Sequence, residues 1–551
     1  MHKGLKFALY IGLCLLSSSL FALSWPYVGN QTYLIFFAFL PILYVERVLS
    51  ESTPRFLSLK IFAYSYLTFF VFNYWTTWWI ELASPGGMWL AVGFNSLFMA
   101  LVFLLFHWTR KVTNNKVGYW ALVIYWLAFE YLHINWELSW MWLTFGNVFA
   151  NDITWIQWYE HTGILGGSLW ILLSNALAFT ITISLIKGRE LGIRKWNWTL
   201  LLLVLIVLPI VLSNYRYHHY VEKTDPVEVV VLQPNIDPYR DKFNGMPEEE
   251  QIDRLIQLSE EKVGHNTELI FAPETAFPLS YWEHKLEDIY GTIETRKFLK
   301  KNPQVKFVVG LSTLGLYESQ HTKSKTARSL NDMSGAYFDY FNSVIQIEDS
   351  EPIKIYRKSK LVLGVERMPF TGQIKLFESL AIELGGATGS LGTEKSPLVF
   401  ESSATDGRKL SVAPAICYES IYGEYITEFV QKGANLIGIV TNDGWWGNTP
   451  GYWQHLSYSK LRAIETRRSI ARSANTGISA FLNQRGDILV QSTWWTEDAL
   501  KGSINLNDEL TFYVRHGDYP GRIAAFFAVL LLVYALVKRL KRPSSVKASL
   551  Q

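Results

Sequence analysis

The sequence predicts an α/β domain joined to an eight-helix transmembrane domain. Apolar residues are unevenly spread: seven long apolar segments precede residue 215 and an eighth lies near the end of the 551 residues. Between residues 215 and 521, short β-branched runs alternate with amphipathic stretches, as in an α/β domain. The 22 Trp and 29 Tyr residues often flank apolar segments, as at membrane interfaces. We therefore expect a membrane domain at 1–214, a folded domain at 215–521 and a closing helix with a basic tail at 522–551.

Each apolar segment is roughly long enough to cross a hydrocarbon core of about 30 Å, although the fifth and eighth are short. The segments are Leu5–Leu23, Gln31–Leu49, Leu57–Ile80, Met88–Trp108, Val117–His133, Ile164–Ile186, Trp196–Ser213 and Ile523–Val537. We expect the first segment to be a retained helix. A signal peptide cleaved near Ser17–Ser19 is the alternative, because small residues stand there.

Basic residues occur in alternate connections between the apolar segments. They are Lys3 and Lys6, then Arg47, Arg55 and Lys60, then Arg110, Lys111 and Lys116, then Lys187, Arg189, Arg194 and Lys195, and finally Lys538, Arg539, Lys541 and Arg542. The intervening loops, including Ile134–Gly163, carry no Lys or Arg. This positive-inside pattern predicts cytoplasmic termini and an extracytoplasmic 215–521 segment.

Short apolar runs between residues 215 and 521 predict strands that are buried on both faces. These runs are Val227–Gln233, Leu269–Ala272, Lys306–Leu311, Ser343–Ile347, Leu410–Ile416 and Leu436–Val440. Glu248–Lys262 and Ser420–Lys432 are amphipathic and predict helices between them.

Composition excludes several classes of function. The net charge of +3 is too small to indicate a nucleic-acid partner. Cys and His residues lack metal-ligand spacing, and His218-His219 is interpreted as a solvated pair, so we expect no metal and no cofactor. The two cysteines, Cys14 and Cys417, provide no disulfide framework. An unpaired thiol outside the cytoplasm suggests a nucleophile, although a small buried apolar residue is the alternative.

Three candidate catalytic residues follow predicted strands or lie in the loops after them. Glu274 lies in Phe271-Ala-Pro-Glu-Thr, Lys358 in Ile355-Tyr-Arg-Lys-Ser, and Cys417 closes Leu410–Ile416. Ligands gather at the carboxyl ends of strands in α/β sheets, so these side chains could converge. A carboxylate can take a thiol proton, and an ammonium favours a thiolate and an oxyanion. Each residue alone could equally be an ordinary loop or surface residue.

The motifs carry a stronger signal together. The strings PETAFP, IYRKSKLVLGVERMPF, APAICYES and TNDGWWG resemble the nitrilase, or carbon–nitrogen hydrolase, superfamily. Seven helices before such a domain and one after it resemble the apolipoprotein N-acyltransferase family across essentially the whole chain. The resemblance implies a nitrilase-like αββα sandwich as the catalytic domain.

The resemblance also implies roles for site residues. Glu274 matches the general base, Lys358 the oxyanion stabiliser and Cys417 the nucleophile. Glu366, Tyr418 and Glu419 match positions that support these three residues in the family. The loop Leu361–Glu366 reads LVLGVE where the family usually has LVPFGE, so its shape is expected to differ.

Lipid contacts are less well marked. The family's usual tryptophan after the Gln-x-Asn-Ile-like stretch is missing, and Phe243 stands one position out of register. Trp445 and Trp446 could line an apolar entrance, or belong to an ordinary interfacial belt. Glu130, near the outer end of the fifth apolar segment, is a weaker candidate for function.

The implied reaction is ping-pong acyl transfer through a Cys417 thioester. The donor is a membrane phospholipid, usually phosphatidylethanolamine in the family, and the acceptor is the N-terminal amine of a diacylated apolipoprotein. This places the protein in the bacterial inner membrane with its catalytic domain in the periplasm. The alternatives are a membrane-tethered amidase with the same three residues, a non-catalytic lipid-binding protein, and a Cys–His enzyme that uses His455 as base.

Overall fold

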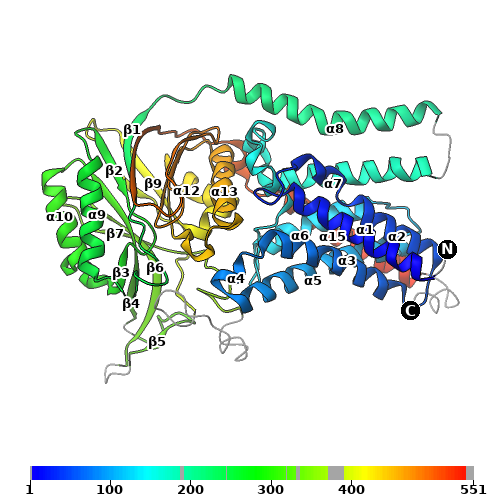
Figure 1. Cartoon of the computed structure of the whole chain (residues 1–551), viewed down its shortest axis with the longest axis horizontal. Coiled ribbons are helices and arrows are strands. Elements are labelled where there is room, and N and C mark those ends of the chain that lie inside the picture. Colours follow the sequence, from blue (N-terminus) through cyan, green and yellow to red (C-terminus); the bar gives the residue numbers. More distant parts are fainter. Residues whose placement is uncertain are drawn as a thin grey trace. The chain divides into compact units, whose positions relative to one another are not determined.

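The computed structural model describes residues 3–186, 192–243, 245–317, 319–330, 335–369 and 390–541. The chain forms two compact units (Figure 1), one made of Met1–His219 with Asp518–Gln551 and the other of Tyr220–Gly517. Three of the basic residues in the predicted charge pattern, Lys187, Arg189 and Arg542, lie outside the described residues.

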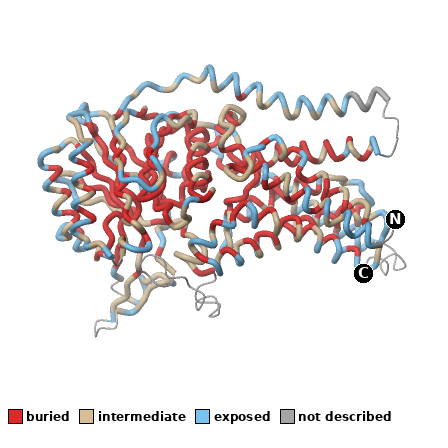
Figure 2. The backbone as a smooth tube through the Cα atoms, in the orientation of Figure 1, coloured by how far each residue is buried: buried red, intermediate tan, exposed pale blue. Residues whose placement is uncertain are grey.

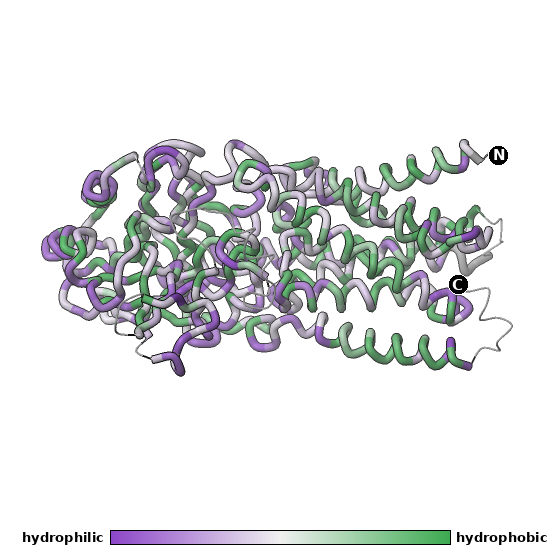
Figure 3. The backbone as a smooth tube through the Cα atoms, turned by 90° about the horizontal axis from the view of Figure 1, so that it is seen from below, coloured by the Kyte–Doolittle hydropathy of each residue, from purple (hydrophilic) through white to green (hydrophobic). Residues whose placement is uncertain are grey.

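The first unit has helices at all eight predicted apolar segments. They are α1 (Lys3–Ser24), η1 (Thr32–Phe37) with α2 (Leu40–Ser52), α3 (Leu57–Thr77), α5 (Pro85–Val112), α6 (Trp120–Ile134), α7 (Tyr159–Ile186), α8 (Gly192–His219) and α15 (Tyr519–Leu540). Short helices α4 (Ile80–Ala83), η2 (Phe145–Asn151) and η3 (Ile153–Trp155) lie in the connections. The long helices are mainly hydrophobic along their length (Figure 3).

Six helices of the described chain are long and apolar enough to cross a membrane. The predicted segments at α3 and α6 fall outside this group for different reasons. Helix α6 has 15 residues, which span only about 22 Å at 1.5 Å per residue. Helix α3 has 21 residues, but Lys60 and Asn73 lower its mean hydropathy. Both helices pack within the unit, α3 against α1 and α5, and α6 against α15.

The second unit contains two β-sheets. The first sheet has the order β14-β1-β2-β4-β6-β5, with β3 paired to β4 and β7 paired to β6. Its strands are β1 (Pro226–Gln233), β2 (Thr267–Phe271), β3 (Phe277–Trp282), β4 (Lys306–Tyr317), β5 (Arg328–Ser329), β6 (Tyr337–Ile347), β7 (Lys354–Arg357) and β14 (Asp498–Asn505).

The second sheet has the order β13-β12-β11-β10-β9-β8. Its strands are β8 (Phe400–Ser403), β9 (Lys409–Ile416), β10 (Leu436–Thr441), β11 (Ile470–Ala474), β12 (Ala480–Leu482) and β13 (Ile488–Gln491). Strands β9, β10 and β11 are parallel and fully or almost fully buried, which explains their continuous apolar runs.

Helices cover the outer faces of the two sheets. Helices α9 (Glu248–Lys262) and α10 (Tyr290–Lys301) pack on the first sheet, and α12 (Gly423–Gln431) and α13 (Pro450–Thr466) lie on the side of the second (Figure 1). The strands between these layers are buried (Figure 2). The predicted αββα sandwich is therefore confirmed.

Two glycines allow the sheets to pack face to face. A Cβ on Gly438 of β10 would lie 2.2 Å from Phe271 of β2, and a Cβ on Gly502 of β14 would lie 2.8 Å from Phe481 of β12. Each phenyl ring thus fills the space that a side chain on the opposite strand would need. The small residue on one sheet and the large one on the other fix the spacing of the two layers.

We expect Gly438→Ala to destabilise the protein by about 1–3 kcal/mol, because the new methyl group overpacks the contact with Phe271. The matched control is Gly264→Ala, whose Cβ would approach no atom more closely than the flexible end of Lys501 at 3.3 Å. Thermal unfolding of both full-length variants in detergent measures the difference. Equal midpoints would contradict the inferred packing.

Candidate active site

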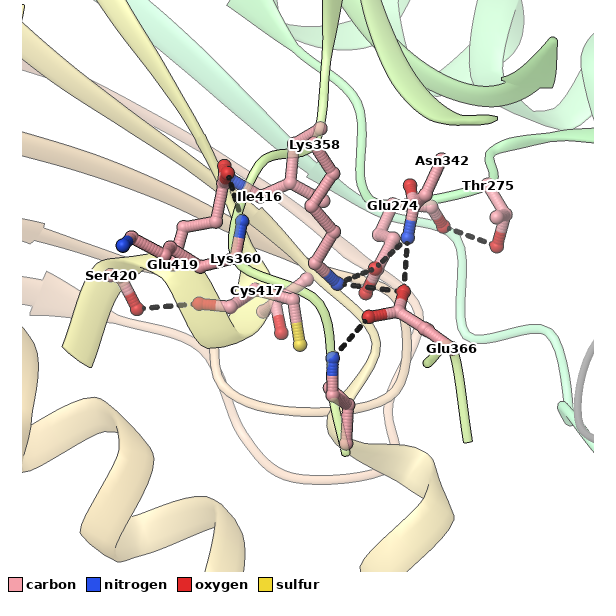
Figure 4. Close-up of polar contacts among 12 residues, drawn as sticks. Glu274, Thr275, Asn342, Lys358, Lys360, Glu366, Ile416, Cys417, Glu419 and Ser420 are labelled. Atoms are coloured by element: carbon pink, nitrogen blue, oxygen red, sulfur yellow. Dashed lines mark hydrogen bonds and ion pairs between the residues drawn. The ribbon is translucent and has the colours of Figure 1, made fainter. Parts of the chain in front are cut away.

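The three predicted chemical residues meet in one place. Glu274 follows β2, Lys358 follows β7, and Cys417 follows β9 as the first residue of η5 (Cys417–Ile421). All three are buried, with 7%, 1% and 9% of their surfaces exposed. Figure 4 shows them around a common centre with Glu366. The structure therefore brings Glu274, Lys358 and Cys417 together near strand ends, as predicted.

Lys358 is the hub of this centre. Its Nζ donates to Glu366 Oε1 at 2.8 Å and to Glu274 Oε1 at 3.2 Å (Figure 4). Although burial alone lowers the pKa of Lys358, its two carboxylate partners raise the pKa above the ordinary lysine value. Lys358 is therefore a permanent ammonium, able to donate hydrogen bonds but not to act as a base.

Asn342 of β6 bridges the two carboxylates. Its Nδ2 lies 2.7 Å from Glu274 Oε1 and 2.8 Å from Glu366 Oε1. Glu366 is fixed further by the backbone N–H of Val362, which donates to Oε2 at 2.8 Å. The donors thus hold two like charges side by side in a buried position, where unpaired carboxylates would be costly.

Cys417 has the left-handed backbone conformation, with φ = 48°. Only a few per cent of non-glycine residues adopt positive φ, and such strain often marks functional sites. The predicted helix at Ser420–Lys432 begins later, at Gly423, because η5 first turns the chain away from β9. This turn presents the Cys417 side chain at the end of the strand.

Ionisation of the Cys417 thiol is strongly unfavourable in the resting site. Burial is the main cause of a pKa well above the usual thiol range, the negative charge of Glu274 raises it further, and Lys358 opposes both. The thiol is therefore protonated at neutral pH, and forming the thiolate requires a proton acceptor inside the site.

Glu419 joins the cysteine turn to the lysine loop. Its Oε1 accepts from Tyr356 Oη at 2.7 Å and Ser359 N at 2.6 Å, while Oε2 accepts from Ile416 N at 3.0 Å. Burial raises the pKa of this carboxyl. Because Ser359 and Ile416 adjoin Lys358 and Cys417, Glu419 fixes the two reactive residues relative to each other.

The backbone of Glu274 passes unusually close to β4. A Cβ on Gly310 would lie 2.7 Å from the Glu274 Cα and 2.7 Å from the Pro273 carbonyl oxygen. Buried Lys242 donates from Nζ to the Glu274 carbonyl oxygen at 3.0 Å. Burial lowers the pKa of Lys242 to about 7, although Glu274 opposes this shift.

Aromatic residues named as lipid-contact candidates lie partly together. The rings of Phe243 and Trp445 are stacked, with centroids 6.3 Å apart, and Tyr239 meets Trp445 edge-on at 5.2 Å. Trp446 packs edge-on against His455, and Tyr418 against Tyr422. Phe243, Trp445 and Trp446 are all half-buried.

Glu130 lies in the helical unit, buried in α6. Its Oε1 accepts from Phe145 N at 3.0 Å and from Trp126 Nε1 at 3.3 Å. These contacts anchor the start of η2, which gives this carboxyl a structural explanation.

Sequence reasoning missed Asn342 and Lys242. Asn342 was detectable as a polar residue beside the apolar run Ser343–Ile347, but its two partners come from other strand ends. A third omission is Asp443, which forms a buried group with Cys417 and His455 whose potential ligand atoms lie within 4.8 Å of one another. Asp443 is already paired with both His455 and Arg472. A cation would enter beside a guanidinium, so we assign this group no metal.

The second unit is a carbon–nitrogen hydrolase domain, as a family model that spans most of it shows. The family model described as carbon-nitrogen hydrolase matches residues 229–509, and the model for the apolipoprotein N-acyltransferase N-terminal domain matches residues 17–177. An amidase from Nesterenkonia sp. is a solved structure that aligns at 14% identity over 55% of this chain and 97% of its own, with a TM-score of 0.35.

Full-length relatives extend the comparison to the whole chain. The apolipoprotein N-acyltransferase of Chlorobaculum tepidum is 31% identical over 96% of this chain and 97% of its own. Apolipoprotein N-acyltransferase 1 of Treponema denticola is 24% identical over 99% of this chain and 100% of its own. The chain belongs to the apolipoprotein N-acyltransferase family.

We expect the alkylation of Cys417 by iodoacetamide to report the charge of Glu274. In the Cys14→Ser background, the pH midpoint of alkylation should lie well above that of free cysteine, and Glu274→Gln should move it to lower pH. The sign follows because a nearby carboxylate opposes formation of a thiolate. Glu401→Gln, at an exposed carboxylate paired with Lys409, is the control. A midpoint that stays in place or rises in Glu274→Gln would contradict the arrangement.

Proposed function

We propose that this protein transfers an acyl chain from a glycerophospholipid to the N-terminal α-amine of S-diacylglyceryl-cysteine on a lipoprotein. Phosphatidylethanolamine is the proposed donor. Family membership supports acyl transfer to lipoproteins, because the curated relatives are named for that activity. The single observation that carries the proposal is the buried Lys358 ammonium, held between Glu274 and Glu366 beside the Cys417 thiol.

The first half-reaction would form a thioester. Glu274 takes the thiol proton of Cys417 as Sγ attacks the ester carbonyl carbon of the phospholipid. Lys358 stabilises the resulting oxyanion. The bond from that carbon to the glycerol oxygen then breaks, the oxygen receives the proton from Glu274, and lysophospholipid leaves.

The second half-reaction would form the amide. The neutral α-amine of the lipoprotein attacks the thioester carbonyl, and Glu274 accepts the proton that the nitrogen loses. The bond from carbon to Sγ breaks, and the thiolate recovers the proton from Glu274. The product is an N-acylated lipoprotein, and the site returns to its starting protonation state.

Glu366 and Glu419 would support these steps without exchanging protons with substrate. Glu366 keeps Lys358 charged through the 2.8 Å ion pair. Glu419 holds the backbone on both sides of the site. We assign Phe243, Trp445 and Trp446 to contacts with the acyl chain, because their half-buried rings offer a large apolar surface. Tyr418, next to Cys417, packs edge-on against Tyr422 and keeps its proposed supporting role.

The membrane arrangement is part of the proposal. The unit of Met1–His219 and Asp518–Gln551 would span the bacterial inner membrane, with Tyr220–Gly517 in the periplasm. The alternating basic connections support this orientation. Both proposed substrates are membrane lipids, so anchoring the enzyme gives it direct access to them.

We expect Cys417 to become acylated when phosphatidylethanolamine is the only substrate supplied. Intact-mass and peptide mass spectrometry of the purified protein would detect the hydroxylamine-sensitive adduct, and added diacylated lipopeptide should discharge it as N-acylated product. Glu274→Gln should slow thioester formation by about 10²–10⁴-fold, and Lys358→Ala by about 10²–10³-fold.

Cys14→Ser is the matched control for this experiment and should retain the adduct. An unchanged adduct in Cys417→Ser would make the nucleophile assignment untenable. Release of free fatty acid with no N-acylated lipopeptide would instead assign the amidase-like hydrolytic alternative, and no adduct with any phospholipid would favour a non-catalytic lipid-binding protein.

Cysteine labelling is expected to show the orientation. In the Cys14→Ser background, Glu261→Cys on exposed α9 should react with a membrane-impermeant maleimide in intact spheroplasts. Glu51→Cys, at an exposed position in the last turn of α2, should react only after lysis, because the positive-inside pattern places it in the cytoplasm. The reverse labelling would exclude a periplasmic catalytic unit.

A further inference from the structure

A second buried charged cluster lies directly behind the nucleophile. It consists of Asp443 at the start of η6 (Asp443–Trp446), His455 of α13 and Arg472 of β11, each with at most 1% of its side chain exposed. Arg472 pairs with Asp443, and His455 Nδ1 lies 2.9 Å from Asp443 Oδ1. Although burial alone would raise it, Arg472 and His455 hold the pKa of Asp443 at about 2.

The other ring nitrogen of His455 faces the backbone of the nucleophile. His455 Nε2 lies 3.2 Å from the Cys417 carbonyl oxygen and 3.1 Å from Ser420 Oγ. Ser420 Oγ itself donates to the same carbonyl oxygen at 2.7 Å. The single hydroxyl proton is thus used in the shorter contact, which leaves Ser420 Oγ an acceptor toward His455.

Nε2 therefore lies between two acceptors, and a ring nitrogen so placed carries a proton. On the opposite side of the ring, a protonated Nδ1 donates to Asp443 Oδ1 at 2.9 Å, whereas an unprotonated Nδ1 accepts from Arg472 at 3.2 Å. These partners hold the imidazole plane whether Nδ1 carries a proton or not. In either form the Nε2–H points to the Cys417 carbonyl oxygen.

This contact acts on a strained residue. Cys417 has φ = 48°, a conformation that persists only where the surroundings enforce it. The position of its Sγ depends on the orientation of the adjoining peptide, which Ser420 and His455 bind from one side. Glu419 fixes the end of β9 by accepting from Ile416 N at 3.0 Å.

We propose that His455 is a positioning residue for Cys417: its Nε2–H anchors the Cys417 carbonyl and thereby holds the strained turn that aims Sγ at substrate. Asp443 and Arg472 hold the imidazole in place. In this role His455 does not take the thiol proton, which goes to Glu274. The inference deepens the proposed function and rests on it.

The test compares His455→Gln, whose side-chain amide keeps an N–H donor, with His455→Ala and Ser420→Ala. Single-turnover thioester formation with phosphatidylethanolamine vesicles gives the acylation rate. We expect His455→Ala to lose up to about 10²-fold in rate, the effect of displacing a reacting group by about 1 Å, with little change in the phospholipid concentration at half-maximal rate. Ser420→Ala should lose less, and His455→Gln should recover most of the rate.

The pH dependence separates positioning from proton transfer. His455→Gln should keep the wild-type pH profile of the acylation rate, because the groups whose titration sets that profile are not His455. If His455 is the base, His455→Gln will be as inactive as His455→Ala, and the inference is overturned. A wild-type rate in His455→Ala overturns it as well, even where the unfolding temperature falls.

Iodoacetamide alkylation of Cys417 provides a second measurement that does not depend on acyl transfer. If wild-type protein forms no thioester, the proposed function fails, while alkylation still tests the anchoring contact: His455→Ala and Ser420→Ala should change the rate, and His455→Gln should stay close to wild type. If His455→Ala does not fold, the comparison of Ser420→Ala with His455→Gln decides. An alkylation rate in Ser420→Ala identical to that of wild type would then overturn the inference.

Discussion

The structure of the site depends on one interaction, the buried ammonium of Lys358 between Glu274 and Glu366. Two carboxylates and one ammonium carry a net charge of −1, with the Cys417 thiol neutral beside them. Moving the thiol proton to Glu274 exchanges a carboxylate for a thiolate and leaves that net charge unchanged. An oxyanion would preserve it as well. The desolvation cost of burying these charged groups therefore arises during folding. The proposed chemistry only moves the negative charge among groups around a fixed cation.

The fold provides this arrangement through strand ends and close approaches. Glu274 and Cys417 follow strands of different sheets, so the distance between them depends on how the sheets pack. Gly438 and Gly502 set the spacing of the layers, and Gly310 lets the Glu274 backbone lie against β4. Glu419 then joins the peptides beside Lys358 and Cys417. A substitution at any of these positions can displace the site without removing a reactive group.

Much of the fold and of the site was predictable from the sequence, and there is a physical reason why the rest was not. Continuous apolar runs marked the parallel strands β1, β2, β9 and β10, because burial on both faces demands them. The positions of Glu274, Lys358 and Cys417, each just past a predicted strand or in the loop after one, predicted that these side chains would converge. Asn342, Gly310 and the Asp443–His455–Arg472 cluster were not predictable in this way. Their importance depends on the register and spacing of segments that are distant in sequence, and Arg472 on β11 carries no local signal of its partner on η6.

Burial of the thiol serves the proposed chemistry in two ways. With 9% of Cys417 exposed and its pKa raised, the resting sulfur is a poor target for oxidants, which react with exposed thiolates. In the periplasm proposed for this unit, an unpaired cysteine needs such protection. Burial also limits the access of water to a thioester on Sγ. The same three residues would serve the hydrolytic alternative equally well, so transfer and hydrolysis differ in whether the lipoprotein amine or water reaches the thioester.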